Sequence, residues 1–365
     1  MSLAGINISN VNALTNAGWI DASAGDLSIQ VNGALISTGG YIGSHQGAVS
    51  LNAGATLNLT STNVGSETGT LTLNGPIVAL QSVSQIYGKE IVVDGDTLLI
   101  GKDAHLGLHD TLSQNGSANI YPGKVTINSS KLTINATESE EKGSGVDGTD
   151  IVFNGSSITM NGDRAHISGS GVVTLGSNED DKLISIKAET GGDITGNNVK
   201  LNAHEAIFNQ KSTVSGTTGV EIHAPTLVVD NGSSVSSLSG SVTISLPSNA
   251  GEDAELSIQL GQDLDGSVGK IQGVSVSIGS ESNSTTVSGG IVTANGSGAS
   301  DKVTIRGNSV NVDGSAVSSD KGGILLDAGS GGVKLTDTNL KSTNTGGIVV
   351  EADGAGNITL DKTTV

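Results

Sequence analysis

Short apolar segments recur along the chain at a regular spacing, separated by glycine and small polar residues. Near the end, the sequence GGILLDAGSGGVKLTDTNLKSTNT is followed by a second copy, GGIVVEADGAGNITLDKTTV. In these two copies Ile324 aligns with Ile348, and Val333 aligns with Ile358. Because apolar and polar residues alternate within these segments, they predict short β-strands with one buried face.

Each copy holds three such segments and three polar corners. A repeat of this kind, with a period of about 23 residues, predicts one turn of a parallel β-helix. A coil of that length has a perimeter of about 75 Å, enough for three short sides around a narrow apolar interior. No coil buries its apolar face alone, so stacking creates the core. We therefore expect an all-β, single-stranded, right-handed parallel β-helix with about three short strands per turn.

The repeat can be followed along most of the chain. Successive marker segments begin at Leu27, Val49, Leu71 and Ile91. Later markers begin at Val125, Ile151, Val172, Val199, Val220, Val242, Val274, Val303 and Ile324. We count about 15 coils, which would give a rod of roughly 70 Å. Because the chain begins and ends inside the repeat and a solenoid needs polar caps, we expect residues 1–365 to be one continuous segment of a longer protein.

Four stretches break the register and are interpreted as inserts. They are residues 101–122, 137–150, 247–255 and 279–286. No segment has a convincing helical period, so any helix should be short and lie in an insert.

Composition narrows the function classes. Glycine occurs 54 times without a Gly-X-Y period, which excludes collagen, and aromatic residues make up only 2% of the chain, which argues against a thick globular core. The absence of cysteine excludes disulfides and thiolate metal sites. A formal net charge of −19 disfavours binding to nucleic acid or anionic membranes. No apolar stretch is long enough to span a membrane, so we expect no membrane insertion, and we expect a monomer.

Two segments carry a family resemblance: 47–59, GAVSLNAGATLNL, and 323–329, GILLDAG. They resemble the repeats of filamentous haemagglutinin-type exoproteins, which are large bacterial adhesins exported by two-partner secretion. The resemblance implies a rigid stalk that is secreted or displayed outside the outer membrane. It also implies an outer-membrane transporter for export, and a receptor or glycan on host or bacterial surfaces as partner. The Asn-Pro-Asn motifs of the family's secretion domain are absent, and autotransporter passengers have similar repeats.

Enzymatic β-helices need converging carboxylates, and those that bind polysaccharides usually have aromatic platforms. The acidic residues lie mostly at corners and inserts, which we interpret as solvated surface, and the aromatic residues are scattered in sequence. The two densest acidic groups are Glu138, Glu140, Glu141, Asp147 and Asp150, and Glu252, Asp253 and Glu255; the only arginines are Arg164 and Arg306, and the scattered aromatic residues are Trp19, Tyr41, Tyr87 and Tyr121. A non-enzymatic shaft is therefore expected, with a polysaccharide lyase or hydrolase, or the shaft of a contact-dependent toxin-delivery protein, as alternatives.

Metal and modification sites have weak signals. His105 and His109 would share one face of a strand, but no third ligand is evident, so we expect both at the surface. Asp193 follows two glycines without completing a calcium nonapeptide. Asparagines at stacked corners are expected to form side-chain amide ladders rather than glycosylation sites. We therefore expect no catalytic residue, no metal ligand and no cofactor.

Overall fold

The chain is an all-β parallel solenoid. The computed structural model describes residues 5–107, 123–136, 143–177, 183–251, 253–262, 266–343 and 346–365. Within these ranges there are 35 strands and no helix, and the described strand-to-strand pairings run parallel. No helix among the described residues is long and apolar enough to cross a membrane. The chain divides into two compact units, 1–175 and 176–365, which are described separately.

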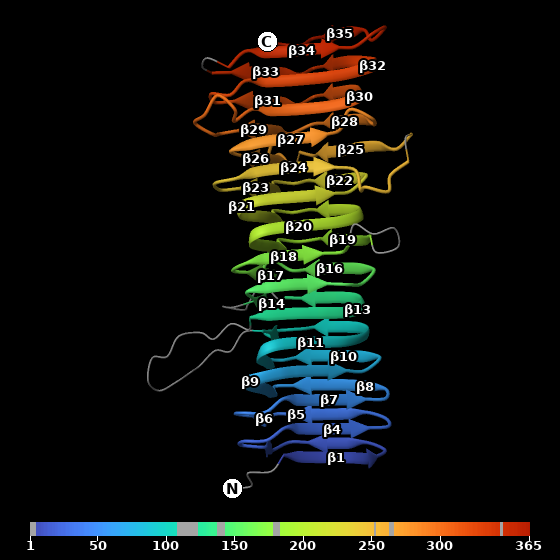
Figure 1. The fold of residues 1–365 in the computed structure, drawn as a ribbon, viewed down its shortest axis with the longest axis vertical. Coiled ribbons are helices and arrows are strands. Elements are labelled where there is room, and N and C mark those ends of the chain that lie inside the picture. Colours follow the sequence, from blue (N-terminus) through green and yellow to red (C-terminus); the bar gives the residue numbers. More distant parts are fainter. Residues whose placement is uncertain are drawn as a thin grey trace. The chain divides into compact units, whose positions relative to one another are not determined.

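In the first unit, strands stack on three faces, and successive coils lie one above the next (Figure 1). Face 1 contains β1 (Ile6–Val11), β4 (Leu27–Val31), β7 (Val49–Ala53), the end of β9 (Asn63–Asn74), the middle of β11 (Gln85–Ile100), the start of β13 (Lys124–Asn135), β15 (Asp150–Phe153) and β18 (Val172–Leu175). Face 2 contains β2 (Leu14–Asn16), β5 (Leu35–Thr38), β8 (Thr56–Thr60), β10 (Ile77–Gln81), the ends of β11 and β13, and β16 (Ser157–Asn161). Face 3 contains β3 (Trp19–Asp21), β6 (Tyr41–Ser44), the starts of β9 and β11, β12 (His105–Leu106), β14 (Ser144–Gly148) and β17 (Ala165–Gly169).

The second unit has the same three-sided plan. One face contains the middle of β20 (Asp193–Phe208), the end of β21 (Thr213–His223), β24 (Ser241–Ser245), β27 (Ser275–Gly279), the starts of β30 (Val303–Asp313) and β32 (Ile324–Thr336), and β34 (Ile348–Ala352). Another contains β19 (Ile184–Ala188), the end of β20, β22 (Thr226–Val229), β25 (Glu255–Leu260), β28 (Ser284–Ser288), the ends of β30 and β32, and β35 (Ile358–Asp361). The third contains the starts of β20 and β21, β23 (Ser234–Ser237), β26 (Lys270–Gly273), β29 (Ile291–Ala294), β31 (Ala316–Ser319) and β33 (Asn339–Ser342).

Strand register confirms most of the predicted repeat. Leu71 pairs with Val49 on one side and with Ile91 on the other, as the marker segments require. Ile324 pairs with Ile348, and Val333 pairs with Ile358. The inward side chains of these strands are mainly Val, Ile and Leu, and those of the inner coils are fully buried. Each such side chain contributes about 1.5–3 kcal/mol through burial, which is why the stack holds without a thick core.

Two markers are wrong by a short shift. Val173, rather than Val172, pairs with Ile151 and points inward, while Val172 is 39% exposed. The Val172 amide donates a hydrogen bond to the Asp150 carboxylate, which ends the corner one residue later than expected. Similarly, Val276 rather than Val274 pairs with Val242.

The structure also shortens the expected inserts. In 101–122, the described part includes β12 in regular register with β11. In 137–150, residues 144–148 form β14, a buried strand of face 3, instead of solvated surface. In 279–286, β28 already begins at Ser284. Residues 108–122, 137–142 and 252 lie outside the described residues, and β25 already begins at Glu255, the last residue of the expected insert 247–255.

Candidate functional site

One row of outward residues on face 3 of the first unit carries most of the distinctive side chains. Because every inward neighbour of this row from Ile42 to Ile167 is buried, the row itself points away from the core. Two positions further along each strand, a second row includes Asp21, Tyr87 and Asp147. The first row runs through Trp19, Tyr41, Asn63, Gln85, His105, Gly145 and His166.

Glycines in the second row make room for two tyrosine rings. A Cβ atom at Gly43 would lie 2.1 Å from the Tyr41 hydroxyl oxygen, and one at Gly65 would lie 2.1 Å from Cζ of Tyr87. Each ring therefore occupies the space beside a glycine, and Tyr41 and Tyr87 are only 8% and 9% exposed although both residues point away from the core. Burial, together with the Tyr87 phenol, raises the pKa of Tyr41 far above its ordinary value.

Trp19 extends this aromatic row into solvent. Its ring centroid lies 5.4 Å from that of Tyr41, with the planes tilted by 44°, and the residue is 79% exposed. A tilted contact at this distance is a favourable aromatic arrangement, so Tyr41 supports the Trp19 ring from one side. Trp19, Tyr41 and Tyr87, although scattered in sequence, therefore lie together on face 3, and Tyr121 lies outside the described residues.

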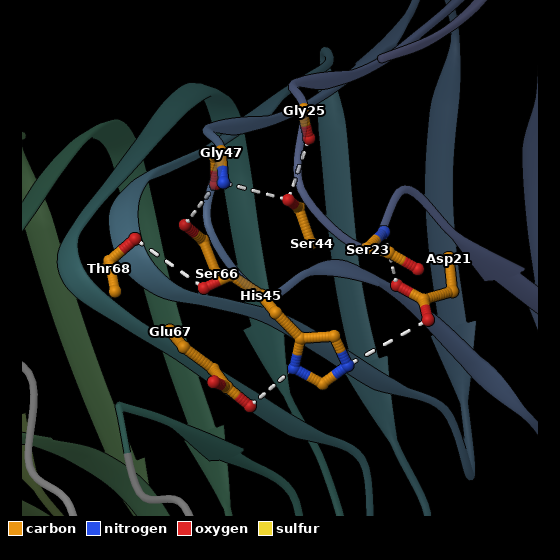
Figure 2. A network of polar contacts seen from close by, with 9 residues as sticks. All are labelled: Asp21, Ser23, Gly25, Ser44, His45, Gly47, Ser66, Glu67 and Thr68. Atoms are coloured by element: carbon orange, nitrogen blue, oxygen red, sulfur yellow. Dashed lines mark hydrogen bonds and ion pairs between the residues drawn. The ribbon is translucent and has the colours of Figure 1, made fainter. Parts of the chain in front are cut away.

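A carboxylate–imidazole network lies beside the aromatic row. Figure 2 shows the His45 ring between two acids: its Nδ1 is 2.8 Å from Oε1 of Glu67, and its Nε2 is 3.8 Å from Oδ2 of Asp21. The His45 and Glu67 side chains are half exposed, and that of Asp21 is about one-third exposed. We call Trp19, Tyr41, Tyr87, Asp21, His45 and Glu67 the Trp19 patch.

Buried serines hold the corners that carry this network. The Ser44 hydroxyl donates to the Gly25 carbonyl oxygen (2.7 Å) and accepts from the Gly47 amide (2.8 Å). One coil later, the Ser66 hydroxyl donates to the Gly47 carbonyl oxygen at 2.8 Å (Figure 2). Each serine ties its corner to the coil below, so the residue after it, His45 or Glu67, is held at the surface.

A second cluster lies further along the same face. Nδ1 of His105 is 3.3 Å from Oδ2 of Asp147, and Nε2 of His166 is 3.2 Å from the same oxygen. Burial alone would raise the pKa of Asp147, but hydrogen bonds and charge interactions with the two imidazoles outweigh it and hold the pKa at about 2. The carboxylate is therefore ionised at neutral pH. We call His105, Asp147 and His166 the His–Asp–His cluster.

The cluster corrects two sequence-based expectations. His105 is buried, at 3% exposure, rather than at the surface, and His109 lies outside the described residues. Asp147 is buried on β14 instead of being part of a solvated insert. The third member, His166, was not singled out, since it is distant from His105 in sequence and only the stacking of three coils brings the two together.

Other acidic and basic candidates among the described residues have partners of their own. Asp150 accepts from the Val172 amide, Glu255 accepts from the Thr286 hydroxyl, and Arg306 pairs with Asp327 and Glu281. Asp193 accepts from the Thr213 hydroxyl. The candidates outside the described residues are Glu138, Glu140, Glu141 and Glu252.

Corner asparagines form the expected side-chain ladders. The Asn128 amide donates to Asp94, and the Asn154 amide donates to Asn128 at 2.9 Å. Asn161 donates to Asn135 in the same way. These ladders lie at the edges of face 1 and face 2, away from both candidate sites.

Comparison of the chain with protein-family models, with curated proteins and with solved structures finds no match.

Proposed function

We propose that this chain is a non-enzymatic shaft segment of a large bacterial adhesin, secreted or displayed at the cell surface, and that it binds glycans through the Trp19 patch. The observation that carries the proposal is the largely exposed Trp19 ring, supported by Tyr41 and flanked by the Asp21–His45–Glu67 network. The family resemblance of the repeats supports the adhesin role and export through an outer-membrane transporter.

The Trp19 patch has the composition that sugar recognition requires. The C–H groups of a sugar ring pack on the face of an aromatic ring, which for Trp19 is open to solvent. Sugar hydroxyls donate to carboxylates, and Asp21 and Glu67 offer two acceptors on the coils before and after that of His45. Because His45 connects the two acids, these groups are already oriented before a ligand arrives.

The remainder of the molecule supports the shaft role. In both units, short strands repeat the same inward Val, Ile and Leu pattern, and the corners are polar. Such a solenoid gains length without a change in cross-section. The formal net charge of −19 suits a surface exposed to solvent.

Glycan-array binding tests the proposal. The wild-type protein should bind a defined set of glycans, and Trp19→Ala should weaken that binding at least tenfold, about 1.4 kcal/mol, since the platform is lost. Leu238→Ala is the matched control, because Leu238 is similarly exposed (78%) but lies in the second unit. Binding that survives Trp19→Ala, or that is lost equally in Leu238→Ala, would remove the Trp19 patch as the site.

A polysaccharide lyase or hydrolase is the second candidate. The observation that favours it is again the Asp21–His45–Glu67 network, in which two carboxylates flank a base next to an aromatic platform. Incubation with acidic and neutral polysaccharides, followed by assays for reducing ends and for unsaturated uronate, distinguishes the candidates. Turnover that disappears in Glu67→Gln would establish an enzyme and contradict the non-enzymatic role.

A further inference from the structure

The His–Asp–His cluster has the donor set and the spacing of a metal site. Two imidazole nitrogens lie 3.2 and 3.3 Å from one carboxylate oxygen, and the three ligand atoms all lie within 4.8 Å of one another. Around a tetrahedral zinc ion with bonds of about 2.0–2.1 Å, ligand atoms are separated by about 3.3–3.4 Å. The two shorter edges of the cluster therefore match those of a tetrahedral site.

Proton positions at His166 favour a cation in the cluster. Nδ1 of His166 lies 3.2 Å from the Arg164 carbonyl oxygen, which only accepts, so Nδ1 carries the proton. Without metal, Nε2 donates to the Asp147 carboxylate only if the ring is a doubly protonated imidazolium; in the neutral ring Nε2 is a lone pair that can share a cation with this carboxylate. A metal ion between them would satisfy both atoms. An imidazole N–H held by a backbone carbonyl is also the usual outer support of a metal-bound histidine.

Gly145 makes the approach of the two histidines possible. It lies between His105 and His166 in the strand register, so the two histidines are two strand spacings apart, about 9.6 Å along the stack. Their ring centroids are nevertheless 5.5 Å apart. A Cβ atom at Gly145 would lie 2.6 Å from Cδ2 and 2.7 Å from Nε2 of His166, so the imidazole occupies the space of the missing side chain.

Burial of the cluster suits a bound ion. The His105 and Asp147 side chains are 4% and 11% exposed, while His166, at 19%, leaves an opening to solvent. Among the described residues, Nε2 of His105 is buried with no hydrogen-bond partner. The ring therefore makes its polar contact through Nδ1, the atom that faces the Asp147 carboxylate.

We propose that His105, Asp147 and His166 bind a transition-metal dication of the zinc class, which links β12, β14 and β17 of three successive coils. Two imidazoles and one carboxylate suit zinc, cobalt, nickel or copper better than magnesium or calcium, which require oxygen ligands. Three protein ligands leave a fourth position for water. The proposal is independent of glycan binding at the Trp19 patch.

Zinc titration of the whole protein, purified without a polyhistidine tag and stripped with a chelator, tests the site. We expect one zinc ion per chain with a micromolar or tighter Kd in competition with a chromophoric chelator. X-ray absorption of the loaded protein should show nitrogen and oxygen ligands at about 2.0–2.1 Å, and zinc should raise the Tm.

Variants locate the bound ion. His166→Ala, the most accessible member, and Asp147→Asn, which keeps the side-chain shape, should each weaken zinc binding at least tenfold and reduce the shift in Tm. The control is His223→Ala, which removes a half-buried histidine of the second unit whose Nδ1 lies 2.8 Å from the Ser245 hydroxyl, and which should bind zinc as the wild type does. Far-UV circular dichroism checks that each variant is folded.

Two results would overturn the proposal. One is a wild-type protein that takes up no stoichiometric zinc, which would leave the cluster a hydrogen-bonded triad. The other is zinc binding that persists unchanged in the folded His166→Ala and Asp147→Asn proteins, since the ion would then lie elsewhere. The zinc titration and the X-ray absorption spectrum of the wild-type protein do not depend on any variant. They therefore test zinc binding even if a variant fails to fold.

Discussion

At the scale of single residues, His223 in the second unit makes stability depend on pH. Its Nδ1 lies 2.8 Å from the Ser245 hydroxyl. Burial and the nearby Lys200 ammonium lower its pKa below the ordinary 6.5, against an opposing effect of Glu221. In the range just below pH 6.5 the unfolded chain therefore binds a proton that the folded protein does not, so folding stability falls as the pH drops.

His223→Gln should remove this dependence while keeping a side-chain partner for Ser245. We expect the Tm of the wild type to fall more than that of the variant between about pH 7.5 and about pH 5.5, a range in which few ordinary carboxylates titrate. Thermal melts of both proteins at the two pH values measure the difference. An equal fall in Tm would show that another group causes the pH dependence.

Single residues are also where sequence-based reasoning failed. Trp19, Tyr41 and Tyr87 are far apart in sequence, and their grouping depends on the coil-to-coil register and on Gly43 and Gly65, which give the rings space. The sequence shows that glycines occupy strand positions 43 and 65. It does not show that these glycines make room for tyrosine rings, because that inference requires the alignment of the outward rows from coil to coil.

At the scale of strands and corners, buried serines fix each coil to the one below. Ser66 is fully buried, donates to the Gly47 carbonyl oxygen and accepts from the Gly69 amide at 3.0 Å. Its loss would remove a partner from the buried Gly47 carbonyl and from the half-buried Gly69 amide, at a cost of about 1–3 kcal/mol. The same corner carries Glu67, so removal of the Ser66 hydroxyl should also loosen the Trp19 patch.

We therefore expect Ser66→Ala to reduce the free energy of unfolding by about 1–3 kcal/mol. Chemical denaturation measures the change. Ser50→Ala is the control, because Ser50 is only half-buried and accepts a hydrogen bond from the side chain of Asn52 rather than from a backbone amide. A Ser66→Ala protein as stable as Ser50→Ala would mean that the corner hydrogen bonds contribute little.

The positions of strands could be predicted from the sequence where their inward side chains follow the apolar repeat. Leu27, Val49 and Leu71 recur because each must fill the same narrow interior, and this constraint fixed both the period and the strand positions. Outward residues obey no such constraint. Consequently β14 was misread as an insert: its Gly and Asp content is typical of loops, while its only large apolar residue is Val146.

At the scale of the whole molecule, the described strands of each unit pair with strands of the coil before and the coil after. β24 has partners on both sides, β21 and β27, and its Val242 and Ile244 are fully buried. β35 pairs with β32, and its Ile358 and Leu360 are about half exposed. Stability in such a stack is a sum of neighbour terms, so a coil with one neighbour should open at a lower free energy.

Hydrogen exchange of the protein of residues 1–365 should therefore be graded along each unit. We expect amides of β24 to exchange more slowly than those of β35 by a factor on the order of a hundred, because opening β24 breaks two ladders and exposes a buried core segment. Mass spectrometry of peptides that cover both strands measures the two rates. Leu335→Ala, which removes a buried contact on β32 next to β35, should accelerate exchange in β35 and leave β24 unchanged. Equal rates in β24 and β35 would instead indicate that the stack opens as one cooperative body, and the additive description of its stability would be wrong.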